Sequence, residues 1–489
     1  MHSRYNPRQE AEKYINTLNL RGAEYLVLIE PGLGYMIPPL REKYPAARII
    51  ALHVEDQSGA ARDGETLPDT GGAASWSSGS GIDPEEFLAR LIPDCSASAI
   101  RIIEWRPSLV RYGESYLRLL SAAANFIKRS DANFRTVKGF GKRWFRNFLK
   151  NLKLLRNFPV YEGLPGPMVI TGSGPGLEES IPLIAEMKRQ GNLFILGASS
   201  SVKALLCRGI LPDLVLSTDG GPWALLHLYE CFRGGINTAA ARIPAIAAAL
   251  SAALPSQCGN VPLLGLSDGS FWQSLILRRL NIPHIPLVQR GTVTASAIDL
   301  ALAMGSGKVL IAGMDLAVRD IRTHVRPYSF DRLPAEKASR LNPVYAQAYV
   351  RSAGIADGGS HQIYASWFSS RLKAYPDRLY TLGSNNQVFQ GLKEWKNLTT
   401  KDTKDTKGKN ADPSSIAYQA RITNIRLPED PAGFAVTILG EALSDPRTKG
   451  PMMEELSALL FPGRQGVEAG ELAGEIGALA GPYCGVNYG

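Results

Sequence analysis

The chain has 489 residues, 45% of them hydrophobic and 20% charged, which is typical of a globular protein large enough for two to four domains. The net charge is +9, and five widely spaced cysteines argue against a disulfide framework and against a zinc site. Residues 243–254 form the most apolar stretch, which is too short to span a membrane, and the polar beginning of the chain has no signal-peptide core. We therefore expect a cytoplasmic protein without a transmembrane segment.

The first 125 residues alternate strand-like and helix-like segments. The apolar runs AEYLVLI, ARIIALHV and SAIRIIE predict three strands, and the turn EPGLGY follows the first of them. The same order occurs in Rossmann-like methyltransferases, where an acid after the second strand, here Glu55 or Asp56, binds a ribose. Because the turn has only two glycines, we favour a Rossmann-like domain without catalytic function. Residues 58–81 are rich in glycine, serine and aspartate and are expected to form a loop.

A basic segment follows, from Lys128 to Arg156, with ten lysines or arginines and one acid. Its apolar residues recur at helical spacing: Trp144, Phe145, Phe148, Leu149 and Leu152. We interpret the segment as a connecting helix that packs by this stripe and exposes a basic face. Binding of an acidic partner or a membrane surface is the alternative, whereas no nucleic-acid-binding module is recognisable.

The central part of the chain predicts a parallel sheet. Five continuous apolar runs end in small or polar residues and are mostly separated by helical lengths: MVITGSG, NLFILGASS, DLVLSTDGG, VPLLGLS and KVLIAGMDL. Ligands of such sheets bind at the carboxyl ends of the strands. The loops that should gather there are residues 172–176, 199–201, 218–221 and 313–315.

The loop after the first of these strands is a glycine cluster, Gly172, Gly174 and Gly176. Glycines tolerate positive φ and let a ligand approach the backbone, and the amides of a following helix can face an anion. Pro175 and Leu177 interrupt the dinucleotide-binding spacing. From the residues alone, the glycine cluster is equally well interpreted as an ordinary tight turn or as a nucleotide-binding loop.

These patterns predict a multidomain α/β protein. A low-complexity, charged stretch near residue 400 reads as a disordered linker, and helical segments follow it. The expected parts are a Rossmann-like domain (1–125), a basic helical connector (126–160), a parallel-sheet domain (161–397), the linker (398–415) and a mostly helical C-terminal region (416–489).

The central part resembles the small bacterial sialyltransferases. Four motifs carry the resemblance in order: GSGPGL, the run QRGTVTASAIDLALAMGSGKVLIAGMDL, the loop PYSFD, and GSHQIY followed by RLYTLGSNN. The whole chain to about residue 395 resembles the motility-associated factor (Maf) family of flagellin glycosyltransferases, with SRYNPRQEAEKY, LRGAEYLVLIEPGLGY and GKRWFRNFLKN as further matches. This resemblance implies inverting, metal-independent transfer of a nonulosonic acid from a CMP donor to serine or threonine of flagellin, in the cytoplasm and without a cofactor.

The resemblance also implies catalytic residues. His361 matches the general base, and a histidine pKa near 6.5 suits proton removal at neutral pH. His324 is the competing base because it lies close to the tyrosine loop. Tyr328 would donate a hydrogen bond to the departing phosphate. The family's second tyrosine is absent, since its position falls on Arg322 or Ala317; Arg322, Arg326 or Arg290 could supply positive charge instead.

The donor would be held by the loops at the sheet edge. Thr292 and Thr294 precede a predicted helix and could bind the sugar carboxylate, or cap the helix. Backbone amides of Ser173 to Gly176 would line the phosphate and ribose of CMP, with Gly174 at positive φ. The remaining candidates are Gly172, Pro175, Ser199, Thr218, Asp219 and Asp315.

Two other functions compete. GSGPGL and LVLSTDGG also resemble archaeal pterin pyrophosphokinases, which would use ATP and Mg²⁺ with Asp219 and Asp315 as ligands. The absent second tyrosine favours a third class, a non-enzymatic flagellar assembly factor with the basic segment as a docking surface. We rank the transferase first because its four motifs occur together and in order.

Overall fold

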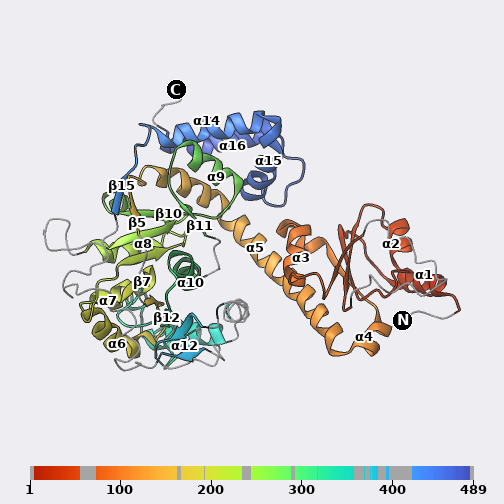
Figure 1. Cartoon of the computed structure of the whole chain (residues 1–489), viewed down its shortest axis with the longest axis horizontal. Coiled ribbons are helices and arrows are strands. Elements are labelled where there is room, and N and C mark those ends of the chain that lie inside the picture. The colour runs from red at the N-terminus through yellow and green to blue at the C-terminus, as the bar shows by residue number, and fades with distance from the viewer. Residues whose placement is uncertain are drawn as a thin grey trace. The chain divides into compact units, whose positions relative to one another are not determined.

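The computed structural model of the chain describes residues 5–55, 73–161, 167–191, 193–233, 244–287, 292–315, 318–356, 368, 375, 377–383, 392–395 and 421–484. Two compact units make up the chain (Figure 1). The first contains Met1–Gly141 with Ser457–Val467, and the second contains Lys142–Leu456 with Glu468–Gly489. The division falls within the segment expected to be the basic connector. None of the helices in the described ranges has both the length and the apolar character needed to cross a membrane.

The first unit is built on a four-stranded parallel sheet with the strand order β3-β2-β1-β4. The three predicted strands are β1 (Tyr25–Ile29), β2 (Arg48–His53) and β4 (Ile100–Glu104). The fourth, β3 (Ala74–Ser77), falls in the stretch expected to be a loop, so that expectation was wrong for these residues. The helices are α1 (Pro7–Thr17), α2 (Ile37–Lys43), α3 (Pro84–Leu91), α4 (Arg106–Tyr112) and the first part of α5 (Glu114–Leu152).

The second unit contains a nine-stranded parallel sheet with the order β11-β10-β9-β8-β7-β6-β12-β13-β14. The five predicted strands are confirmed as β6 (Met168–Thr171), β7 (Phe194–Ala198), β8 (Leu214–Ser217), β10 (Leu263–Ser267) and β12 (Val309–Ala312), all fully buried. The alanine-rich stretch contains β9 (Ala245–Ala249), which lies inside the sheet between β10 and β8. The two edge strands, β11 (Ile285–Pro286) and β14 (Lys393–Glu394), are short, and so is β13 (Leu379–Thr381), which lies between β12 and β14. The α/β fold with a parallel central sheet is therefore confirmed.

The strand order reverses beside β6. From β6 the chain adds β7 to β11 on one side, and then returns to place β12 on the other side of β6. Thr171 pairs with Ala312, so the loops that follow β6 and β12 leave the sheet at the same level. Ligands of open parallel sheets bind outside the carboxyl ends of the strands at this kind of reversal.

The helices of the central region connect these strands. They are α6 (Leu177–Arg189), α7 (Val202–Leu206), α8 (Ala224–Tyr229), α9 (Phe271–Arg279), α10 (Val293–Met304), α11 (Arg332–Glu336) and α12 (Val344–Ala356). The C-terminal region consists of β15 (Arg421–Asn424), antiparallel to β5 (Asn157–Val160), and of α14 (Pro431–Ser444), α15 (Pro446–Leu460) and α16 (Ala469–Ala480). The Glu455 carboxylate of α15 accepts the N–H groups of Phe271 and Trp272, 2.8 and 3.0 Å away, and so caps α9.

Helix α5 confirms the predicted apolar stripe. Phe145, Phe148, Leu149 and Leu152 are fully buried. The rings of Phe145 and Phe148 pack on Trp272, with centroids 5.4 and 4.7 Å apart. Burial of two aromatic side chains contributes roughly 2–3 kcal/mol each, which fixes this end of the helix on the second unit.

Candidate active site

The glycine-rich turn after β6 packs directly against the loop after β12. The Gly174 N–H donates to the Gly313 carbonyl at 2.7 Å, and the Gly176 N–H donates to the Asp315 carboxylate at 2.6 Å. A side chain at Gly174 would place its Cβ 2.8 Å from the Gly313 carbonyl oxygen and closer still to Asp315. The glycines are therefore required because two loops of the protein meet here.

This arrangement corrects two expectations about the turn. Gly174 does not have positive φ, nor do Gly172 and Gly176; the left-handed residue of this contact is Gly313, at φ 66°. The amides of Gly174 and Gly176 are already hydrogen-bonded within the protein. They are therefore not the row of free donors that the CMP phosphate was expected to meet.

Asp315 lies beside the start of α6 rather than in open solvent. Burial raises the pKa of its carboxyl group, and the hydrogen bond from Gly176 opposes that rise. Gly176 is the N-cap residue of α6 and has no side chain to cap the helix, so the Asp315 carboxylate takes that role. The structural role of Asp315 is thus clear, whereas a role in ribose or metal binding stays a prediction.

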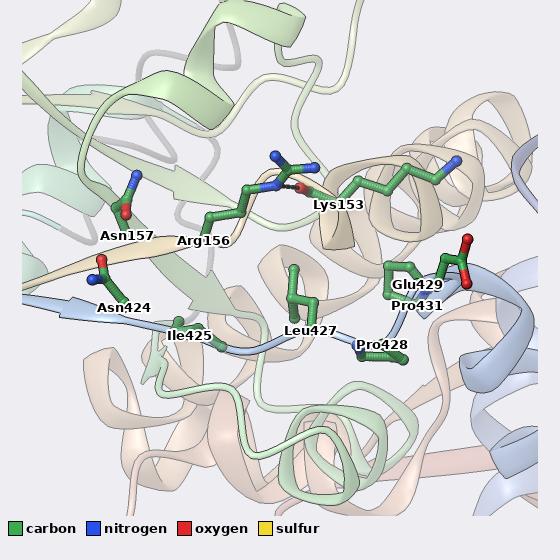
Figure 2. Close-up of a pocket in the computed structure, with 9 residues that line it drawn as sticks. All are labelled: Lys153, Arg156, Asn157, Asn424, Ile425, Leu427, Pro428, Glu429 and Pro431. Atoms are coloured by element: carbon green, nitrogen blue, oxygen red, sulfur yellow. Dashed lines mark hydrogen bonds between the residues drawn. The ribbon is translucent and has the colours of Figure 1, made fainter.

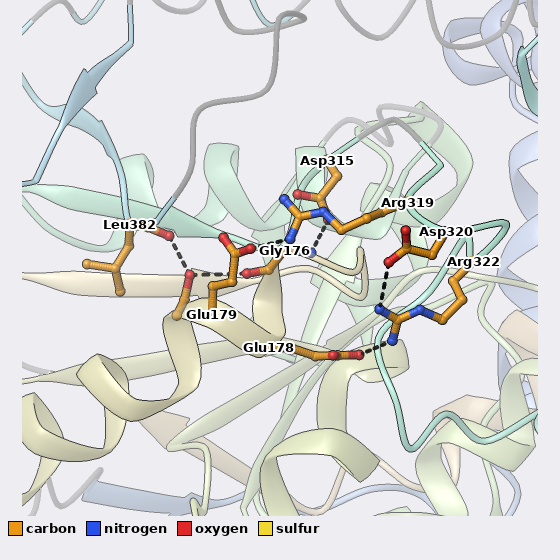
Figure 3. Close-up of polar contacts among 9 residues, drawn as sticks. Gly176, Glu178, Glu179, Asp315, Arg319, Asp320, Arg322 and Leu382 are labelled. Carbon is orange, nitrogen blue, oxygen red and sulfur yellow. Dashed lines mark hydrogen bonds and ion pairs between the residues drawn. The ribbon is translucent and has the colours of Figure 1, made fainter.

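The loop after β12 is tied to α6 by ion pairs (Figure 3). Arg322 contacts Glu178 at 2.9 Å and Asp320 at 3.7 Å, and Arg319 pairs with Glu179. These pairs sit at the first turn of α6, where acidic side chains also favour the helix dipole. Arg322 therefore anchors this loop through its ion pairs.

The same loop crosses the glycine-rich turn further on. The Val325 N–H donates to the Ser173 carbonyl at 2.8 Å, and the Arg326 N–H donates to Glu178 at 3.0 Å. The side chain of Arg326 is exposed. Ser173 is thus covered by the segment that carries His324 and Tyr328, while Arg326 keeps a charge at the surface beside it.

Tyr328 stands between two histidines at the carboxyl edge of the sheet. The His324 ring stacks on the tyrosine ring at a centroid distance of 4.2 Å, with 14° between the planes. On another side, His227 Nε2 lies 3.5 Å from the tyrosine hydroxyl, and Phe330 packs against His227 at 4.5 Å. His227 comes from α8, after β8, so side chains from two separate strand ends meet here.

Burial sets the protonation states of these three groups. It lowers the pKa of His227 to about 4, with a smaller effect of His324. It lowers the pKa of His324 to about 4 as well, with Arg351 acting in the same direction and Asp331 opposing it. Burial raises the pKa of Tyr328, which Asp219 and Asp331 raise further and Arg351 lowers. At neutral pH the site therefore holds two uncharged imidazoles and a protonated phenol.

The remaining predicted donor-binding residues lie at the same edge. Thr292 accepts the Ala295 N–H at 3.1 Å and caps α10, which confirms its capping role. Thr294 lies inside the first turn of α10 rather than before it, and its hydroxyl is next to Gly172. Ser199 is buried just after β7, and Pro175 is buried within the glycine-rich turn. Thr218 and Asp219 follow β8, and the side chain of Asp219 is exposed.

Some polar atoms at this edge have no hydrogen-bond partner within the described part of the chain. They are the Ser217 hydroxyl at the end of β8, His227 Nδ1 on α8 and the Ser329 hydroxyl beside Tyr328. Buried polar groups in native proteins are nearly always paired. A ligand or ordered water can therefore satisfy these groups.

The sequence did not single out the residues of α5 that hold the site loops. Asn147 donates to the carbonyls of Gly220 and Ser251, at 3.1 and 2.9 Å. Asn151, which is fully buried, donates to those of Leu250 and Ala252, at 2.9 and 2.8 Å. The basic helix thereby fixes the loops after β8 and β9. Asparagines inside an otherwise basic and aromatic helix are the only sequence signal of this role.

Several predicted positions lie outside the described residues. These are His361, Arg290, Ala317 and Asp56. Among the described residues, no three His, Cys, Asp or Glu side chains gather closely enough to hold a metal ion.

A pocket of about 550 Å³ lies elsewhere in the second unit (Figure 2). Lys153, Arg156 and Asn157 line one side of it, and side chains from residues 424–431 line the other. The Arg156 Nε group donates to the Lys153 carbonyl at 3.2 Å. No predicted site residue lines this pocket, and it has no cluster of catalytic groups, so we place the candidate active site at Tyr328 instead.

The neutral state of His227 predicts acid sensitivity. Its pKa is about 4 in the folded protein and about 6.5 in the unfolded chain. Between these values the unfolded chain binds a proton that the folded protein does not, so stability falls as the pH falls through this window and is constant above it. We expect His227 to contribute a loss of roughly 2 kcal/mol between pH 7 and pH 5, to which His324, with a similarly lowered pKa, adds. Denaturant unfolding at both pH values should show a smaller loss for His227→Gln; equal losses in both proteins would contradict this account.

Comparisons with known proteins identify the central region. Residues 142–320 match the family described as 6-hydroxymethylpterin diphosphokinase MptE-like. We refer to these residues as the MptE-like domain, after the family that they match. This domain begins at the residue where the second unit begins, and it contains the glycine-rich turn, Asp219 and His227. The segment with His324 and Tyr328 follows its last matched residue.

Two relatives share parts of the sequence. An uncharacterized protein of Treponema pallidum is 30% identical over 287 residues, which are 58% of this chain and 60% of that protein. The chain therefore spans less than two thirds of this relative. A 6-hydroxymethyl-7,8-dihydropterin pyrophosphokinase of Methanothermobacter thermautotrophicus is 26% identical over 185 residues, 37% of this chain and 71% of that enzyme. The expected resemblance of the MptE-like domain to pterin pyrophosphokinases is thus confirmed.

One solved structure aligns over nearly the whole chain. It is the Maf glycosyltransferase of Magnetospirillum magneticum, with a TM-score of 0.49 and 13% identity, covering 98% of this chain and 83% of that one. A similarity at this level supports no statement about the activity of this protein.

Proposed function

We propose that this protein is a glycosyltransferase that moves a nonulosonic acid from a CMP donor to serine or threonine hydroxyls of flagellin in the cytoplasm. In this reaction the bond between the sugar and the phosphate breaks, and CMP leaves with the bonding electrons. The acceptor hydroxyl forms the new bond with inversion at the sugar carbon, and its proton passes to a general base. Neither a metal nor a cofactor takes part in the proposed steps.

The observation that carries this proposal is the environment of Tyr328. A departing phosphate needs a hydrogen-bond donor that stays protonated, because negative charge grows on its oxygen as the bond breaks. Burial raises the pKa of the Tyr328 hydroxyl, so the phenol keeps its proton at neutral pH. The stacked His324 and the nearby His227 hold the ring in place without adding charge.

Other residues would complete the site. Thr292 and Thr294, at the beginning of α10, would bind the sugar carboxylate. Arg326, which is exposed, and Arg290 would offset the charge of the phosphate, in place of the second tyrosine that the family has. His361 would accept the proton of the acceptor hydroxyl. The roles of His361 and Arg290 rest on the sequence resemblance alone.

A pyrophosphokinase is the second candidate, and the similarity of the MptE-like domain to the Methanothermobacter enzyme favours it. That reaction would use ATP and Mg²⁺, with Asp219 and Asp315 as ligands. The hydrogen bond from the Gly176 N–H already engages one of the two oxygens of the Asp315 carboxylate, and Asp219 is exposed. A non-enzymatic flagellar assembly factor is the third candidate.

One experiment separates the three candidates. The purified protein is incubated either with a CMP-nonulosonic acid or with ATP, Mg²⁺ and hydroxymethyl-dihydropterin, and the nucleotide products are measured by liquid chromatography. We expect release of CMP, slow without flagellin and faster with it. Release of AMP would identify a pyrophosphokinase, and no nucleotide product under either condition would support an assembly factor.

A further inference from the structure

Helix α12 exposes an apolar surface close to the candidate active site. Tyr345 and Tyr349, one helical turn apart, are 70% and 64% exposed, Val350 is 72% exposed, and Leu341 just before the helix is 92% exposed. Among the side chains of α12 that the structure describes, only Ser352 is buried. Large exposed apolar side chains that occur together in one short segment point to a place where another molecule binds. We refer to Leu341, Tyr345, Tyr349 and Val350 as the α12 surface.

A chain of contacts connects this surface to Tyr328. The Tyr328 N–H donates to the Asp331 carboxylate at 2.7 Å, and α11 begins at the next residue. The side-chain amide of Gln347, on α12, donates to the carbonyl of Pro334, in α11, at 3.2 Å. The α12 surface is therefore held by a short, hydrogen-bonded connection to the residue that carries the proposed chemistry.

The charges around the surface are mostly positive. Between residues 332 and 356 the chain has four basic residues, Arg332, Lys337, Arg340 and Arg351, and one acid, Glu336. All four of these basic side chains are exposed. We call these four residues the basic rim. Together with the exposed apolar side chains, they are complementary to a protein segment that carries apolar side chains flanked by acidic ones.

We propose that the α12 surface docks the acceptor protein, through an acidic and apolar segment that binds beside the hydroxyl to be modified. The proposal rests on the proposed transfer to a protein. A single serine or threonine offers too few contacts for selective binding, so a protein acceptor must be recognised away from the reacting hydroxyl. Aromatic side chains such as Tyr345 and Tyr349 supply most of the binding energy in protein interfaces of this type.

The test compares three proteins: the wild type, a double variant that carries both Tyr345→Ser and Tyr349→Ser, and the single variant Phe434→Ser. Phe434 is a matched control because it is 47% exposed on α14 and lies outside the α12 surface. With purified flagellin as the acceptor, we expect the double variant to raise KM about ten- to a hundredfold, with kcat unchanged. CMP release without flagellin should stay at the wild-type rate, and Phe434→Ser should change neither quantity.

A charge variant tests the basic rim separately. Lys337→Glu with Arg340→Glu should raise KM for flagellin at low salt, and high salt should reduce the difference from wild type. An unchanged KM in the double tyrosine variant would overturn the proposal. A changed oligomeric state of the double tyrosine variant would also overturn it, because a second copy of the chain would then cover the surface. A large loss of unfolding free energy in this variant would overturn it too, because the chain itself would then cover the surface.

A failure of the docking proposal can be distinguished from a failure of the proposed transferase function. If wild-type protein releases no CMP, the transferase is wrong, and biolayer interferometry with immobilised flagellin still tests docking directly. Wild-type binding that the double tyrosine variant weakens about tenfold would support the α12 surface, and equal binding by both proteins would contradict it.

Discussion

Gly174→Val is expected to destabilise the second unit by about 3 kcal/mol, at the upper end of the usual cost of overpacking, because the new side chain would overlap the loop after β12. Its Cβ would lie 2.8 Å from the Gly313 carbonyl oxygen and closer to the Asp315 carboxylate. Neither neighbour can move freely, since Gly313 accepts the Gly174 N–H and Asp315 accepts the Gly176 N–H. Denaturant unfolding, followed by far-UV circular dichroism, measures the loss.

Two further variants show whether the overlap is the cause. Gly440 is exposed on α14, and a Cβ there would meet nothing within 4 Å, so Gly440→Val should change the unfolding free energy by less than about 0.5 kcal/mol. Asp315→Ala should partly restore the unfolding free energy that Gly174→Ala loses, because it removes the carboxylate that the new methyl group would overlap. A Gly174→Val protein with wild-type stability would mean that the turn has room for a ligand after all.

Tyr328→Phe is expected to slow CMP release about 10²- to 10³-fold, the usual effect of removing one hydrogen-bond donor to a developing negative charge. The substitution removes only the hydroxyl, so the stacking of His324 should survive and the fold should remain. The measurement is the initial rate of CMP release at saturating donor, together with the affinity for CMP by calorimetry. A wild-type rate in Tyr328→Phe would exclude Tyr328 as the donor to the leaving group.

His361→Ala provides the complementary result. Loss of a general base typically costs about 10²- to 10⁴-fold, and here it should reduce transfer to flagellin while CMP binding stays nearly intact. His324→Ala should instead affect the Tyr328 environment, since the two rings stack. If His324→Ala abolishes transfer and His361→Ala does not, the base is His324.

The fold followed from local patterns where those patterns were strong. The five fully buried strands of the central sheet read as continuous apolar runs, and such runs are typical of parallel strands covered on both faces. Two strands gave weaker signals. Strand β3 has four residues between glycine- and serine-rich stretches, and β9 is nearly all alanine, which favours helix by propensity. Pairing with neighbouring strands overrides that preference.

The site was only partly predictable, because its contacts join distant parts of the chain. The tyrosine loop was found by resemblance, but His227 comes from α8, 101 residues earlier, and no local pattern distinguishes it from a core histidine. The glycine-rich turn reads like a ligand loop, although its glycines face Gly313 and Asp315. A sequence can show that a position holds a small residue. Only the folded chain shows which neighbouring residue requires the small size.

The most direct test of the central claim is a nuclear magnetic resonance titration of the ¹⁵N-histidine-labelled protein with CMP. The chain has six histidines, and His284, whose Nδ1 lies 3.0 Å from the Ile282 carbonyl oxygen just after α9, serves as the internal control. If CMP binds beside Tyr328, the ring signals of His227 and His324 should shift as CMP is added, while those of His284 and of His53 in the first unit stay in place. Saturation with CMP, verified by calorimetry, without any shift of the His227 and His324 signals would contradict the account.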